Sequence, residues 1–98
     1  YAIKLDSVYL NAYYSRGRLK CLSFKEYDTA IQDFSYVIKK FNPSNLTDKL
    51  FLATIYVLRG SSYDLSGNLD NACSDFNKAK GLGLKEADDL INNKCLNK

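Results

Sequence analysis

The sequence contains no histidine, and this absence restricts the chemistry that the chain can carry. Histidine is the commonest general base and the commonest metal ligand in proteins. A cysteine nucleophile would lack its usual base, and Cys21, Cys73 and Cys95 are too few and too widely spaced for a zinc site. We therefore predict no catalytic residue, no metal site and no cofactor, and we disfavour a thiol enzyme or redox element.

Long apolar runs are also missing. No stretch approaches the roughly 18 apolar residues of a membrane span, and the opening residues do not form a signal peptide. The first residue is Tyr1 rather than methionine, which suggests a fragment. The compartment therefore stays open: the cytoplasm is slightly favoured, and an extracytoplasmic site is favoured if Cys73 and Cys95 are bridged, because a disulfide requires an oxidising environment.

Charge of one sign is not concentrated anywhere in the chain. The net charge is only +3, and the fourteen cationic and eleven anionic residues are interspersed. A domain that binds nucleic acid usually carries a clustered basic face. RNA binding is therefore disfavoured, and we predict no nucleic-acid partner.

The residues that are present predict an all-α protein. An apolar fraction of 46% excludes disorder, and 98 residues make one small domain at most. Apolar side chains recur at intervals of three and four, the period of one helical face. A first helix is expected to end near Asp6 and Ser7, and Asn42 and Pro43 are expected to stop a later one. The further helices are expected at about 8–22, 27–41, 46–65, 69–80 and 84–96.

Two stretches of the chain share one pattern. Tyr13 to Gly17 is followed by Ala30, Phe34 and Val37, and Tyr56 to Gly60 is followed by Ala72, Phe76 and Ala79. A glycine inside a helix costs up to about 1 kcal/mol relative to alanine, so a neighbouring helix is expected to approach closely there. Arg16 and Arg59 precede these glycines, and we interpret them as structural, with packed stems and heads in water, rather than as phosphate ligands.

These residues resemble the tetratricopeptide repeat, a helix-turn-helix unit of about 34 residues. The resemblance covers essentially the whole chain and implies antiparallel helical hairpins stacked as a right-handed α-solenoid. It divides the sequence into the end of a preceding repeat (1–7), a first complete repeat (8–43), a second repeat (44–83) and a capping helix (84–98). The last repeat and cap resemble those of many bacterial members of the family, which suggests a C-terminal fragment.

The second repeat departs from the family period. Ala2 and Val37 fill equivalent positions 35 residues apart, whereas Val37 and Ala79 lie 42 residues apart. Seven extra residues have therefore entered between Pro43 and Ala53. Because seven residues are close to two helical turns, we predict that the helix of this repeat is lengthened at its start to Leu46. Leu46, Leu50 and Phe51 would continue its apolar face.

The resemblance implies a noncatalytic scaffold that binds a protein or peptide segment in a concave groove. Transferring the groove positions to this chain gives Asn11, Tyr14, Arg18, Thr54, Val57, Ser61 and Asp64, with Cys21 in line with them. Family members that clamp a terminal carboxylate use lysine, arginine and asparagine in the groove; only Asn11 survives of that set, so this activity is disfavoured. The alternative is self-association as a homo-oligomer through surfaces such as Tyr9 and Tyr13.

Cys73 opens one expected helix and Cys95 closes the next. If those helices are antiparallel neighbours, the two thiols reach the same end of the protein, where a disulfide becomes geometrically feasible. The other interpretation is a reduced pair that packs as small apolar side chains.

Overall fold

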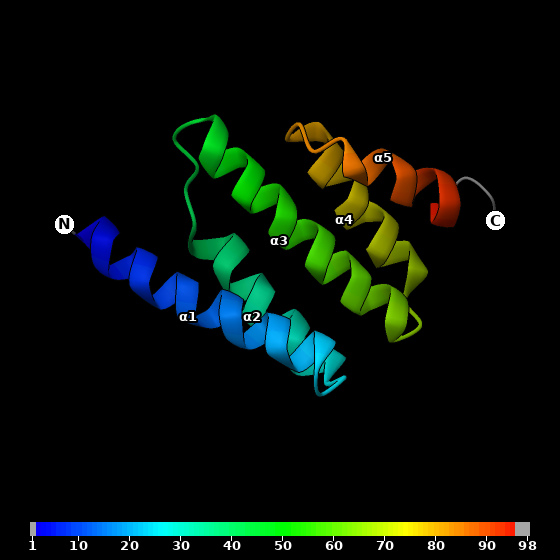
Figure 1. The fold of residues 1–98 in the computed structure, drawn as a ribbon, viewed down its shortest axis with the longest axis horizontal. Coiled ribbons are helices and arrows are strands. Elements are labelled where there is room, and N and C mark those ends of the chain that lie inside the picture. The colour runs from blue at the N-terminus through cyan, green and yellow to red at the C-terminus, as the bar shows by residue number, and fades with distance from the viewer. Residues whose placement is uncertain (1, 96–98) are drawn as a thin grey trace.

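The computed structural model describes residues 2–95, with side chains from residue 10 onward, and this part of the chain is helical with no strand. The prediction of an all-α protein is thereby confirmed. Short turns join the helices, which are coloured along the chain in Figure 1. The elements are α1 (Ala2–Leu22), α2 (Tyr27–Lys40), α3 (Leu46–Leu65), α4 (Leu69–Gly81), α5 (Glu86–Leu90) and the π-helical turn η1 (Ile91–Cys95).

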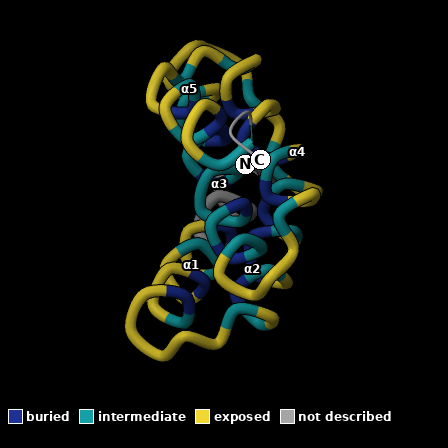
Figure 2. Tube along the Cα trace, turned by 90° about the vertical axis from the view of Figure 1, so that its right-hand side faces the viewer, coloured by how far each residue is buried: buried dark blue, intermediate teal, exposed yellow. Residues whose placement is uncertain are grey.

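The helices form two layers. Figure 2 shows α1, α3 and α5 on one side and α2 and α4 on the other. Each helix packs against the next one along the chain, and α1 also meets α3 directly. The described residues accordingly make a flat body with principal extents of 46 × 30 × 17 Å.

Helix α3 is the central element because it contributes to every part of the core. Ile55 packs among the buried residues of α1 and α2, Ala53 packs with Ala79 and Ala87, and Val57 lies against both C-terminal clusters. Apolar burial of this kind is the main favourable term in folding. Helix α3 therefore joins the two hairpins, while the C-terminal segment packs mainly on α4.

The repeated glycines lie where two helices approach most closely. A Cβ on Gly17 would stand 2.8 Å from Cε1 of Phe34, and one on Gly60 would stand 2.7 Å from Cε1 of Phe76. Both phenylalanines are fully buried. Only glycine therefore leaves room for each ring against the facing helix, which is the close approach that the sequence predicted.

The expected break at Asp6 and Ser7 is wrong, because α1 is a single helix from Ala2 to Leu22. Serine and aspartate cost a helix interior only a few tenths of a kcal/mol, whereas the proline usual in such a connection costs about 3 kcal/mol. Without proline, every backbone N–H in this region can donate within the helix. The helical backbone therefore continues through the boundary expected at residue 7.

The start of α3 was predicted correctly, since the helix begins at Leu46. Asn45 caps it: its side chain accepts a hydrogen bond from the Asp48 backbone N–H at 2.8 Å, and Asp48 in turn accepts from the Ser44 hydroxyl at 2.9 Å. The Ser44 backbone N–H also donates to the Asp48 carboxylate at 3.1 Å, so the two backbone N–H groups of Ser44 and Asp48 have side-chain acceptors. The apolar face does not extend to the first residue, however, because Leu46 is 67% exposed.

The helix expected over about 84–96 is present but begins two residues later. It starts at Glu86 with α5 and continues without a break into η1, in which the hydrogen bonding changes to the π type. Residues 96–98 of the expected cap lie outside the described residues. Ala87 and Ile91 are nevertheless buried, so the segment covers apolar surface as a cap would. Gly83, at φ +105°, lies in the turn between α4 and this segment.

Candidate interaction surface

An ion pair between an arginine and a buried aspartate closes each hairpin. Arg16 donates from Nε and Nη2 to the two carboxylate oxygens of Asp33 at 2.9 and 2.7 Å. Arg59 makes the same two bonds to Asp75 at 2.8 and 2.7 Å. Paired N–H donors match the geometry of a carboxylate and strengthen the contact. The arginine heads are therefore structural, as expected, but they lie in ion pairs rather than simply in water.

These contacts hold both guanidinium groups in the charged form. The hydrogen bond to Asp33 raises the pKa of Arg16, and the hydrogen bond to Asp75 raises the pKa of Arg59 despite partial burial. A raised folded-state pKa contributes stability that is complete below the unfolded-state pKa and is lost only as pH rises through the folded value. The arginines therefore add no pH dependence to folding in the neutral range.

Sequence reasoning missed the aspartates, although a signal was available. The dipeptide Asp-Phe occurs at residues 33–34 and again at 75–76, following the Arg-Gly dipeptides at 16–17 and 59–60. Buried carboxylates are uncommon unless they are paired, and these two side chains are at most 6% exposed. A repeated charge within an apolar stripe therefore indicated a repeated partner.

The predicted groove residues of α1 lie along one face, and two of them are open to solvent. Asn11 and Arg18 are exposed. Tyr14 is half-buried, with its ring edge-on to Phe51 at 5.2 Å between centroids, and the Arg18 guanidinium lies 5.6 Å from the centre of the same ring. This arrangement presents a cation above an aromatic ring.

The predicted residues of α3 are less accessible than those of α1. The Thr54 hydroxyl donates to the Leu50 carbonyl at 2.9 Å, and Ser61 is half-buried. Val57 packs against the C-terminal segment, and the Asp64 carboxylate lies 2.7 Å from Nζ of Lys94 in η1.

The expected single face therefore divides into two parts. We call Asn11, Tyr14 and Arg18 the open half, and Thr54, Val57, Ser61 and Asp64 the covered half.

Cys21, in line with the open half, is buried and receives a hydrogen bond from the Ser62 hydroxyl at 3.2 Å, so it joins α1 to α3. Of the surface expected for self-association, Tyr13 is half-buried and stacks on Tyr36 at 4.3 Å, while the Tyr9 side chain lies outside the described part.

A hollow adjoins the open half at the start of α3. Its volume is about 250 Å³. Aromatic rings form one wall, since Phe41 and Phe51 meet edge-on with centroids 5.3 Å apart. Polar groups of α1 and α3 line the rest. The hollow is formed by Leu10, Asn11, Phe41, Thr47, Asp48 and Phe51.

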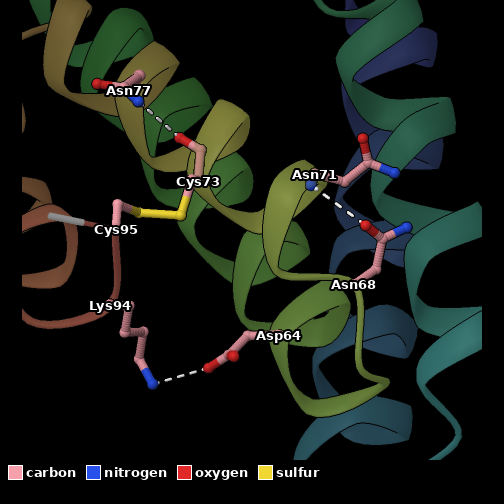
Figure 3. Close-up of a disulfide and its surroundings, with 7 residues drawn as sticks. All are labelled: Asp64, Asn68, Asn71, Cys73, Asn77, Lys94 and Cys95. Atoms are coloured by element: carbon pink, nitrogen blue, oxygen red, sulfur yellow. Dashed lines mark hydrogen bonds and ion pairs between the residues drawn. A yellow bond between two sulfur atoms is a disulfide. The ribbon is translucent and has the colours of Figure 1, made fainter. Parts of the chain in front are cut away.

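Cys73 and Cys95 form a disulfide. Their Cα atoms lie 5.8 Å apart, and the bridge connects α4 near its start to the end of η1, as Figure 3 shows. The same view shows Lys94 reaching Asp64 across this end of the molecule. The sequence left the pairing open against two packed thiols, and the structure has the bridged form.

Known proteins offer no guide to this surface, because no family model, curated protein or solved structure matches the chain. Between residues 2 and 95, no helix is both long and apolar enough to cross a bilayer. In the same range, acidic and cysteine side chains do not gather in a group that could hold a metal ion.

Proposed function

We propose that this chain is a tetratricopeptide-like scaffold that binds an extended or helical segment of a protein partner without catalysis. The repeated Arg–Asp and Gly–Phe contacts support the assignment of two equivalent hairpins. In arrays of such hairpins, the helices of one layer present a continuous surface to ligands. The helices of that layer here are α1 and α3, with the C-terminal segment beside them.

The observation that carries the proposal is the open half beside the aromatic hollow. Asn11 and Arg18 are exposed, whereas Tyr14 is fixed by its contact with Phe51. A rigid aromatic ring next to adaptable polar groups is typical of binding surfaces, because the ring loses little entropy when a partner docks. The partner segment would place an apolar side chain in the hollow and a carboxylate or carbonyl oxygen against Arg18.

The experiment compares partner recovery by the chain and by the double variant Asn11→Ala with Arg18→Ala. Both residues are exposed, so the variant is expected to fold normally. We expect recovery of cross-linked partner to fall about tenfold or more, which corresponds to about 1.4 kcal/mol of binding free energy.

The matched control is Gln32→Ala with Lys39→Ala, which removes one amide and one positive charge from exposed positions of α2. Recovery by the control is expected to equal that of the unmodified chain. Equal recovery by both double variants would place the binding surface elsewhere and overturn the assignment of the open half.

A further inference from the structure

The C-terminal segment makes contacts with the covered half that resemble those of a bound ligand. Ile91 is buried against Ala72 and Phe76, with Val57 and Tyr63 around it. Three positions later, Lys94 forms its ion pair with Asp64. An aliphatic side chain in an apolar site followed by a cation on a carboxylate is a compact recognition pattern. Of the residues that it meets, Val57 and Asp64 are ones that the repeat resemblance assigns to ligands, whereas Ala72 and Phe76 belong to the core of α4.

The segment is not held in place by its own helical structure. Helices α5 and η1 follow each other without a break and have ten residues together, and helices shorter than about 12–15 residues are marginal in isolation. Two covalent connections restrain it: the chain through Gly83 at one end and the Cys73–Cys95 bridge at the other. While both connections hold, the segment cannot swing away from α4, against which it packs, or from Asp64 of α3. When the bridge is open, one covalent connection is left together with the packing of Ala87 and Ile91.

Neither cysteine of the bridge is fully buried. Cys73 and Cys95 are each partly exposed, whereas the third cysteine, Cys21, is free and buried. Exchange with a thiol requires access to a sulfur atom, and the bridge lies at the C-terminal segment rather than within the core of the two hairpins.

We infer that Ile91–Cys95 is an internal occupant of the covered half and that the Cys73–Cys95 bridge is a redox latch that keeps it there. After reduction, a partner segment of the same chemistry displaces it. That partner carries an aliphatic residue followed three positions later by a lysine or arginine, to meet Val57 and Asp64. The inference rests on the proposed binding face, to which it adds a second, regulated half.

The latch opens by thiol–disulfide exchange with a dithiol. One thiolate of the dithiol attacks one sulfur of the bridge, and the other cysteine leaves as a thiolate that takes up a proton. The second thiolate of the dithiol then attacks the mixed disulfide and releases the remaining cysteine. Two electrons pass to the protein, which gains two thiols, and the dithiol becomes a cyclic disulfide.

The first test measures amide hydrogen exchange on the whole chain with and without dithiothreitol, a small dithiol. We expect exchange in residues 88–95 to rise at least tenfold on reduction, while exchange in residues 10–22 of α1 stays unchanged. The double variant Cys73→Ser with Cys95→Ser should show the faster exchange under both conditions. Unchanged exchange in residues 88–95, or an equal rise throughout α1, overturns the latch.

The second test uses a labelled peptide with the sequence of residues 86–95 in which Cys95 is replaced by serine. We expect it to bind the reduced chain at least tenfold more tightly than the bridged chain. The same peptide with Lys94→Glu should bind the reduced chain at least fivefold more weakly. Equal binding to the bridged and reduced chains overturns the inference. Neither test involves Asn11 or Arg18, so the latch and the open half can fail separately.

Discussion

The two hairpins of this protein, α1–α2 and α3–α4, use the same contacts in different surroundings. Each has a glycine against a buried phenylalanine and an arginine bound to a buried aspartate. Arg16, however, leaves 55% of its side chain exposed, and Arg59 leaves only 15%. The sequence repeats the contact, but the neighbouring helix determines how much water reaches it.

The cover over Arg59 comes from the preceding hairpin and from α3 itself. Its third nitrogen, Nη1, donates to the Ser35 hydroxyl of α2 at 3.1 Å. Tyr56 and Tyr63 place their rings 5.5 and 5.7 Å from its guanidinium carbon. Arg16 has one such ring, Tyr13 at 4.9 Å. Because screening by water weakens ion pairs, breaking the Arg59–Asp75 pair should lower the stability of the fold more than breaking the Arg16–Asp33 pair.

Removal of the aspartates should have the largest effect on stability and should show the difference between the two hairpins most clearly. Asp75→Ala leaves Arg59 without a counterion in a site that water hardly reaches, and we expect it to lower the free energy of unfolding by roughly 3 kcal/mol. Asp33→Ala should lower it clearly less, because exposed Arg16 can be solvated instead. Urea unfolding of the two variants measures the difference. Equal losses would show that exposure does not distinguish the pairs.

The glycines should give the next largest effect. A methyl group on Gly60 would meet Phe76 and also stand 3.1 Å from the backbone oxygen of Ala72, whereas the three atoms nearest to one on Gly17 all belong to the Phe34 ring. Overpacking of this kind costs about 1–3 kcal/mol, so Gly60→Ala should lie near the upper end of that range and Gly17→Ala near the lower.

Gly81→Ala is the matched control for the glycine variants, because nothing lies within 4 Å of the position of its added methyl. Its thermal unfolding temperature should equal or exceed that of the unmodified chain, since alanine favours helix more than glycine does. A Gly60→Ala variant as stable as Gly81→Ala would contradict the close approach of α3 to α4.

The start of the second helix in each hairpin should give the smallest effect. Glu26 and Asn68 precede α2 and α4 with similar backbone angles, but only Asn68 accepts a capping hydrogen bond, from the Asn71 N–H at 3.3 Å. Glu26→Asn should therefore stabilise the protein by about 0.5–1 kcal/mol, and Asn68→Ala should destabilise it by a similar amount. Thermal unfolding measures both shifts, and a destabilising Glu26→Asn would show that the contacts of the Glu26 carboxylate with Thr29 and Lys20 matter more than a cap.

The positions of the helices could be predicted because local signals set them. Pro43 and Asn45 set the start of α3, and the apolar period of three and four residues set its length. The continuous α1 was missed because a boundary expected from the repeat was placed where no residue breaks the helix. A helix ends for local chemical reasons, and Asp6 and Ser7 do not supply one.

The contacts of the predicted binding residues could not be read from spacing. Asn11 and Thr54 occupy equivalent positions, as do Tyr14 and Val57, yet their environments depend on what lies beside each helix. The α3 positions meet a C-terminal segment whose change from α5 to η1 no periodic pattern indicated. The partner of an arginine 16 or 17 residues distant likewise depends on how two helices face each other.

The sequence by itself determined an all-helical chain of two similar hairpins, because helical period, proline, glycine and capping residues act within a few positions of one another. The tertiary structure decided which arginine is covered, which half of the predicted face stays open, and that Cys73 meets Cys95. These outcomes depend on the packing of segments distant in sequence, since burial is a property of the neighbours of a residue and not of the residue itself.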